Sequence, residues 1–153
     1  MAQIISLTPL PSRVIFACTH NSIRSPMAAA IGNHLLGQQV QFSSVGVRAQ
    51  EVNPFAVACM AELGLDISGH VPRNFPDLPD NPCDLIISLT PEAQHHGVEL
   101  TRSGQCEAIY WPTQDPSLAH GNRTMILDAF REVREMLQQN IEQLFPRSIA
   151  QSY

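Results

Sequence analysis

The sequence contains no lysine and few charges, and these shortages limit the functions it can serve. All nine basic residues are arginine, charged residues make up 15% of the chain, and the net charge is −5. No basic stripe runs along the chain, so we expect no nucleic acid among its partners. An arginine-only set of cations suits oxyanion binding, because the guanidinium fork matches phosphate oxygens. A lineage preference for arginine explains the same bias equally well.

Long hydrophobic runs are missing too. No apolar stretch approaches the ~20 residues that cross a bilayer. The first twelve residues lack the basic start and the apolar stretch of a secretory signal. We therefore expect no membrane partner and a cytoplasmic location. A chain of 153 residues, 44% of them apolar, is long enough to bury a core. We expect an N-terminal extension over residues 1–12, a single domain over 13–146 and a C-terminal tail over 147–153.

The cysteines lack the spacing of a disulfide framework or of a C-x-x-C pair, so we expect reduced thiols. Cys59 falls in a helical run and Cys83 at the start of a strand, which predicts two small, buried apolar side chains. Cys106 has a similar setting. Only Cys18 stands in a context that indicates chemistry.

Signs of a metal or cofactor site are also weak. His95 and His96 are adjacent, and adjacent residues of a helix do not share a face. No third ligand stands at metal-binding spacing. The sequence contains neither a nucleotide-binding P-loop nor a dinucleotide fingerprint. We therefore expect neither metal nor cofactor.

Short apolar runs alternate with helical patterns along the chain. The runs predict four strands, at Val14–Cys18, Val40–Val45, Leu85–Leu89 and Ala108–Trp111. Three helices are expected to begin where a capping residue precedes proline, at Ser25-Pro26, Asn53-Pro54 and Thr90-Pro91. The last helix shows apolar residues at spacings of three and four and is expected to end at Pro146; these residues are Ile126, Phe130, Val133, Leu137, Ile141 and Leu144.

Strands that alternate with helices predict an α/β fold, a three-layer α/β/α domain with a four-stranded parallel sheet. The uninterrupted apolar character of the first and third strands is typical of strands covered on both faces. In such folds ligands bind beyond the carboxyl ends of the strands. These ends carry Cys18, Ser44, Thr90 and Asp115.

The segment between the first strand and the first helix has the composition of an anion-binding loop. Cys18 ends the strand, Ser25-Pro26 opens the helix, and Arg24 follows Cys18 by six residues. Backbone N–H groups near a helix N-terminus bind anions, and Arg24 would clamp two oxygens of such an anion. The same positive surroundings favour the thiolate form of Cys18, which is the nucleophile. The expected phosphate-binding loop comprises Thr19, His20, Asn21, Ser22, Ile23, Arg24 and Ser25.

At this loop, VIFACTHNSIRSPMA, the chain resembles the low-molecular-weight protein tyrosine phosphatases and the related thioredoxin-coupled arsenate reductases. The resemblance extends over roughly 13–144 and includes Ser44-Val45-Gly46, Gly69-His70 and the run from Trp111 to Pro116. It implies a four-stranded parallel sheet flanked by helices.

The resemblance also implies roles for individual residues. Cys18 would be the nucleophile, Arg24 would bind phosphate in the transition state, and Asp115 would be the general acid. Ser25 would donate to the thiolate, and Asn21 would hold the loop in shape with support from Ser44 and His70. A leaving oxygen needs a proton as its bond breaks, which is the physical reason for the acid. For His70, capping of its own backbone remains an equal alternative.

The chain departs from the family pattern at three places. His20 replaces the usual glycine two residues after the nucleophile. Ile23 replaces a second cysteine that protects the nucleophile in many members, and the later cysteine pair of the reductases would fall near Thr90 and Gly97. Aromatic residues that frame phosphotyrosine are missing, because Gln50 and Ser117-Leu118 occupy their places. Tyr110 and Trp111 either line the pocket or pack in the core.

Three functions follow from these observations. The first is a hydrolase that cleaves phosphomonoesters, on proteins or on small molecules, through a phosphocysteine on Cys18. The second is a single-cysteine arsenate reductase coupled to a low-molecular-weight thiol. The third is a module that binds an oxyanion or a phosphoprotein with little turnover, which His20 and the missing aromatic residues would favour.

Overall fold

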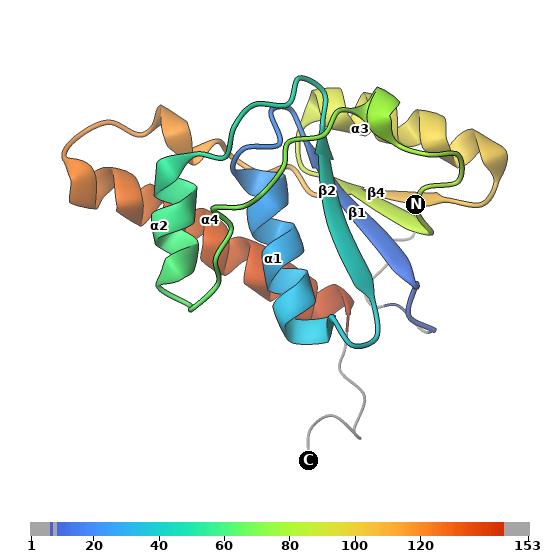
Figure 1. The fold of residues 1–153 in the computed structure, drawn as a ribbon, viewed down its shortest axis with the longest axis horizontal. Coiled ribbons are helices and arrows are strands. Elements are labelled where there is room, and N and C mark those ends of the chain that lie inside the picture. The colour runs from blue at the N-terminus through green and yellow to red at the C-terminus, as the bar shows by residue number, and fades with distance from the viewer. Residues whose placement is uncertain (1–6, 8, 146–153) are drawn as a thin grey trace, which may run out of the picture.

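The computed structural model describes residue 7 and residues 9–145 as three layers, with helices on both faces of one sheet (Figure 1). Pro146, the predicted tail and most of the predicted N-terminal extension lie outside these residues. The strands are β1 (Arg13–Cys18), β2 (Gln41–Gly46), β3 (Leu85–Ser88) and β4 (Glu107–Tyr110). The helices are α1 (Arg24–Leu36), α2 (Pro54–Ala61), α3 (Pro91–Leu100) and α4 (Arg123–Leu144), with short 3₁₀ turns η1 (Phe75–Asp77), η2 (Thr101–Ser103) and η3 (Pro116–Leu118).

The sheet is parallel throughout, with the strand order β2-β1-β3-β4. This confirms the predicted α/β fold with four parallel strands. The central strands β1 and β3 are buried on both faces because their side chains alternate between two cores. Val14 and Phe16 pack in the larger core with α1, α2 and α4, whereas Ile15 and Ala17 pack in the smaller core under α3.

Helix caps follow the predicted pattern at two of three positions. The Asn53 side chain accepts from the N–H groups at the start of α2, and Thr90 does so for α3. The prediction that Ser25 caps the first helix is wrong. That helix begins at Arg24, and among the described residues no side chain caps its N-terminus. Ser25 lies inside the first turn, where its hydroxyl contacts Cys18 Sγ at the end of β1.

Helix α4 buries the predicted apolar residues Phe130, Val133, Leu137, Ile141 and Leu144, while Ile126 is half-buried. Within the described residues, no helix is both long enough and apolar enough to cross a membrane.

Gly46 ends β2 at the point where the loop after β1 passes closest to the sheet. A Cβ atom at Gly46 would lie 2.7 Å from Asn21 Cβ and 2.9 Å from Asn21 N. Asn21 already has a φ of 50°, in the left-handed region, so its backbone has little freedom to retreat. The missing side chain at Gly46 is what lets the loop close over the sheet edge.

We predict that Gly46→Ala destabilises the protein by about 1–3 kcal/mol through this overpacking. At this chain length the loss lowers Tm by several degrees in a thermal melt followed by circular dichroism. Gly69→Ala is the matched control, because a Cβ there meets no atom within 4 Å. Equal Tm values for the two variants would contradict the close approach.

Candidate active site

The thiol of Cys18 lies at the carboxyl end of β1 and is only 2% exposed. Its Sγ is 2.9 Å from Ser25 Oγ, and Asn21 N donates to it at 3.2 Å. Ser25 Oγ also accepts from Asn21 Nδ2 at 2.9 Å, and its other contacts are Cys18 Sγ and, at 3.5 Å, Val45 O. The sulfur is therefore held by contacts with two residues of the same loop and helix start.

The loop after Cys18 turns its carbonyl oxygens outward. Thr19 O accepts from Val47 N and Arg48 N, and His20 O accepts from Gln50 N. The next three carbonyls are bound in the same way; their donors are His70 Nε2 to Asn21 O, Asn53 N to Ser22 O, and Met27 N to Ile23 O, at 2.9–3.0 Å.

This arrangement sets the direction of the loop's N–H groups. In a trans peptide the N–H of one residue points opposite to the carbonyl of the residue before it. The N–H groups from His20 to Arg24 therefore point away from the supporting segments and toward the inside of the loop. Asn21 N, which bonds Cys18 Sγ, shows this direction. A ring of convergent N–H groups beside a thiol is a binding site for an oxyanion.

Asn21 is held in its left-handed conformation from the outer side of the sheet. Its Nδ2 donates to Ser44 Oγ at 2.9 Å, and its Oδ1 accepts from Arg73 N at 3.0 Å and from His70 Nε2 at 3.1 Å. The two oxygens of Asn21 that contact His70 are both acceptors, so Nε2 carries the hydrogen. The sequence offers no signal for the contact of Arg73 with Asn21, because this contact uses the Arg73 backbone N–H.

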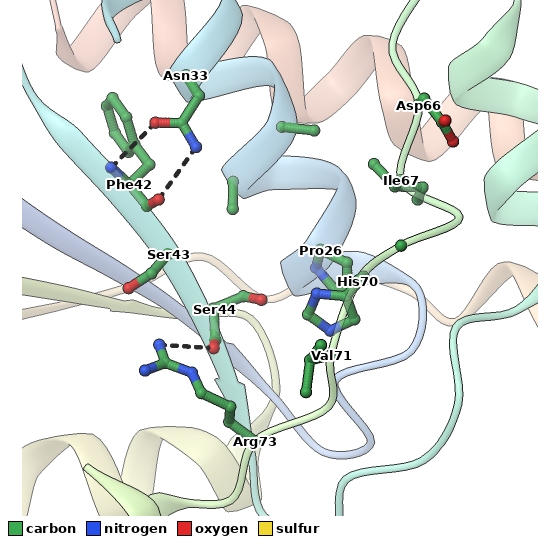
Figure 2. Close-up of a pocket in the computed structure, with 13 residues that line it drawn as sticks. Pro26, Asn33, Phe42, Ser43, Ser44, Asp66, Ile67, His70, Val71 and Arg73 are labelled. Atoms are coloured by element: carbon green, nitrogen blue, oxygen red, sulfur yellow. Dashed lines mark hydrogen bonds between the residues drawn. The ribbon is translucent and has the colours of Figure 1, made fainter.

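Figure 2 shows these supporting residues at the exposed edge of the sheet. Ser44, His70 and Arg73 line a cavity of about 630 Å³ between β2, α1 and the segment 66–73. The Arg73 guanidinium donates to Ser44 O at 3.2 Å, and the Asn33 side chain bonds both backbone groups of Phe42. Side chains thus occupy backbone groups of an edge strand that would otherwise accept another strand.

Arg24 opens α1 and is half-buried. Its guanidinium donates to Thr113 O at 2.9 Å, while Thr113 N donates to Leu89 O at 3.0 Å. Thr113 thereby connects the end of β3 to the guanidinium. The sequence offers no signal for Thr113, because its part is played by a main-chain carbonyl.

Asp115 follows Thr113 by two residues and is half-buried. Its carboxylate accepts from Ser117 N at 2.9 Å and from Ser117 Oγ at 2.6 Å, and so caps η3. The segment that carries Asp115 is therefore connected to Arg24 through Thr113 O. Among the described residues, the Asp115 carboxylate itself bonds only Ser117, within its own turn. The role of Asp115 as an acid stays a prediction.

Further polar residues surround the opening of the loop, here called the mouth of the site. Thr19 Oγ1 donates to Thr90 Oγ1 at 3.0 Å, which joins the loop to the start of α3. Arg48 and Glu92 form an exposed two-bond ion pair at 2.7 and 2.9 Å.

Trp111 packs against Phe16 with ring centroids 6.1 Å apart, which places it at the core. Within the described part of the chain, no group of three His, Cys, Asp or Glu side chains is arranged to hold a metal.

Protonation of His70 makes the stability of the fold depend on pH. Burial holds the pKa of the His70 imidazole below its ordinary value, nearby Arg73 lowers it further, and the bond to Asn21 and the charge of Glu51 oppose this. The unfolded chain therefore binds a proton more readily than the folded one. His70 contributes its full stabilisation above pH ~6.5, and this contribution declines as the pH falls.

We predict that the Tm advantage of the wild type over His70→Gln narrows between pH 7.5 and pH 5. The glutamine variant keeps a donor but has no titrating ring. An NMR titration of His70, assigned by its loss in the variant, should have its midpoint below that of an unfolded peptide. A midpoint above the peptide value would contradict this account.

Comparison with known proteins agrees with the fold and with the family resemblance. Residues 13–152 match the sequence model of the family described as low molecular weight phosphotyrosine protein phosphatase. An arsenate reductase of Halalkalibacterium halodurans is 33% identical over 129 residues, which cover 84% of this chain and 91% of that protein.

Solved structures give the same assignment. An arsenate reductase in the phosphate binding state superposes with a TM-score of 0.71 at 29% identity, covering 86% of this chain and 94% of the other. A low molecular weight protein tyrosine phosphatase from T. tengcongensis superposes with a TM-score of 0.68 at 25% identity, covering 86% and 96%. The family match over nearly the whole chain confirms the resemblance: this chain belongs to the low-molecular-weight phosphotyrosine protein phosphatase family.

Proposed function

We propose that the protein hydrolyses phosphomonoesters through a phosphocysteine formed on Cys18. The observation that carries the proposal is the orientation of the loop backbone, whose five outward carbonyls leave N–H groups directed around the thiol. A phosphoryl group bound there would place its phosphorus in reach of the sulfur. The phosphate-binding arsenate reductase that shares this fold supports an oxyanion at the site.

In the first step the Cys18 thiolate attacks phosphorus and forms the S–P bond, while the bond to the leaving oxygen breaks opposite to it. Arg24 and the loop N–H groups bind the equatorial oxygens, where charge is spread in the transition state. Asp115 gives its proton to the leaving oxygen, which departs as a neutral alcohol or phenol.

In the second step a water molecule attacks the phosphorus of the phosphocysteine. Asp115, now a carboxylate, takes a proton from this water, and the S–P bond breaks to return the thiolate to Cys18. Ser25 Oγ, 2.9 Å from the sulfur, donates to the returning negative charge. Inorganic phosphate leaves, and the step needs no electron donor.

The mouth of the site favours polar over aromatic substrates. Gln50 and Ser117-Leu118 stand where aromatic residues frame phosphotyrosine in the family, and the Arg48–Glu92 pair borders the same opening beside Thr19. We therefore extend the proposal to small phosphomonoesters and phosphorylated proteins whose leaving group carries hydrogen-bonding or charged groups.

We predict that Cys18→Ser reduces hydrolysis of an aryl phosphate to background and that Asp115→Asn reduces kcat by roughly 10²–10⁴-fold. Initial rates of phenyl phosphate hydrolysis across pH measure both effects. The Asp115 effect should shrink for leaving groups that are stable as anions, because these need no proton.

Asp66→Asn is a matched control for Asp115→Asn. Asp66 bonds Ser68 N at 2.9 Å and Ser68 Oγ at 2.6 Å, as Asp115 does with Ser117, but it lies in the segment 66–73 outside the loop. Asp66→Asn should leave the rate unchanged. Hydrolysis that survives Cys18→Ser would refute the mechanism, and tight phosphate binding without turnover would favour an oxyanion-binding module.

A second candidate is arsenate reduction at Cys18 alone. The relative from Halalkalibacterium halodurans is named an arsenate reductase. Thr90 and Gly97 occupy the positions of the later reductase cysteines, so an external thiol would have to complete the reaction. Cys18 would bond arsenic and expel water, and a thiol would attack Cys18 Sγ. This step would release arsenite and leave a mixed disulfide. A second thiol would then free Cys18, and the two thiols would leave as one disulfide.

We predict for this candidate that arsenite production depends on Cys18 and on added glutathione or a similar thiol. One disulfide should form per arsenite, measured by arsenic speciation and by thiol titration. Cys106→Ser should leave the rate unchanged, because Cys106 lies at the amino-terminal end of β4, whereas Cys18 lies at the carboxyl-terminal end of β1. Absence of thiol-dependent arsenite would dismiss reduction and leave phosphate hydrolysis unaffected.

A further inference from the structure

Two thiols that the proposed reactions do not use lie together at the amino-terminal ends of strands β3 and β4. Cys83 lies two residues before the start of β3, and Cys106 directly precedes β4. Their Sγ atoms are 3.4 Å apart. Both side chains belong to the smaller core under α3, with exposed fractions of 0% for Cys83 and 6% for Cys106. All four cysteines of the chain are free thiols in this structure.

The backbone between the two thiols holds them in place. Glu107 N donates to Asp84 O at 3.0 Å, which joins the residue after Cys83 to the residue after Cys106. Asp84 N donates in turn to Arg13 O at 2.9 Å, and the Asp84 carboxylate accepts from Ser12 N and Arg13 N. The proximity of the sulfurs is therefore built into the start of three strands.

We propose that Cys83 and Cys106 form a reversible intramolecular disulfide when the protein meets a hydroperoxide. Formation of the bond shortens the sulfur separation by about 1.4 Å, to ~2.05 Å. Rotation of two short side chains supplies most of this movement, because the hydrogen bonds of Asp84 fix the adjacent backbone.

The reaction balances in two steps. The Cys106 thiolate attacks one peroxide oxygen and becomes a sulfenic acid, while the O–O bond breaks and the other oxygen leaves as water or an alcohol after taking a proton. The Cys83 thiol then attacks Cys106 Sγ and expels water. Two thiols are oxidised to one disulfide, and one hydroperoxide is reduced.

The environment assigns the first attack to Cys106. Of the two side chains it is the more exposed, and it follows the exposed turn that ends η2. The hydrogen bond from Cys83 lowers the pKa of the Cys106 thiol, whereas the same contact and burial raise the pKa of Cys83. Cys83 then serves as the resolving thiol within contact distance.

The disulfide would close the segment 83–106, which contains α3 and its cap Thr90. Cross-linking this loop restricts the unfolded chain and stabilises the fold. The four residues of β3 separate the pair from the carboxyl edge by roughly 13 Å, so exchange with Cys18 is excluded. The inference is therefore independent of the reaction at Cys18.

Peptide mapping of the native wild-type protein tests the proposal. After hydrogen peroxide treatment and alkylation, trypsin places each cysteine in a different peptide, since arginines stand at 13, 24, 48, 73, 102 and 123. We expect a linked pair of peptides 74–102 and 103–123, which dithiothreitol separates. The oxidised protein should melt roughly 6–12 °C above the reduced protein.

Cys106→Ser and Cys83→Ala should each abolish the linked pair and the Tm increase, and Cys59→Ala should preserve both. Either of the first two variants suffices if the other fails to fold. Oxidation of Cys18 in peptide 14–24 reports that peroxide has reacted. Absence of the linked pair under those conditions would overturn the proposal, and so would a linked protein whose Tm does not respond to reduction.

Discussion

The direction of the peptide groups between Thr19 and Ile23 is the constraint on which the site depends. A carbonyl turned inward would repel the anion that the N–H groups attract, so every one of the five carbonyls needs a donor on the outside. The connection from β2 to α2 supplies three of these donor sets, the segment around His70 supplies one, and the first turn of α1 supplies the last. The elements around the loop are therefore as much a part of the proposed anion site as the loop itself.

The thiol and the guanidinium depend on different supports. Cys18 is set by hydrogen bonds within the loop, through Asn21 and Ser25, and these are fixed from the sheet edge. Arg24 is set from the opposite direction, by a main-chain carbonyl that follows β4. An anion that binds Arg24 would compete with Thr113 O for the guanidinium. Binding of an anion in the loop would thus weaken the contact between Arg24 and the segment from Thr113 to Asp115, without any change in the sheet.

The sequence predicted the features that depend on contacts between near neighbours, namely the strands and two of the helix caps. Alternating apolar runs located the strands, and Asn53 and Thr90 were found because a helix cap is a contact between near neighbours. Ser25 has the same cap-like sequence, but a contact with Cys18 seven residues away outweighs the local preference. Thr113 and Arg73 act through backbone groups on distant segments, and no side-chain pattern encodes such contacts. The 3.4 Å approach of Cys83 to Cys106 likewise depends on the pairing of β3 with β4.

The two edges of the sheet offer their thiols different surroundings. At the carboxyl-terminal ends of the strands, Cys18 is surrounded by convergent N–H groups, which suit the anionic substrate of the proposed reaction. At the amino-terminal ends of β3 and β4, the hydrogen bond from Cys83 lowers the pKa of the Cys106 thiol, although the charges of Asp84 and Glu107 oppose this. The sulfur that ionises more readily is therefore already in contact with a second thiol. Ile23 stands where many family members have a second cysteine, so Cys18 has no neighbouring thiol there with which to form a disulfide. The proposed disulfide is therefore kept apart from the proposed nucleophile, because the only two sulfurs in hydrogen-bond contact among the described residues lie beside the amino-terminal ends of β3 and β4.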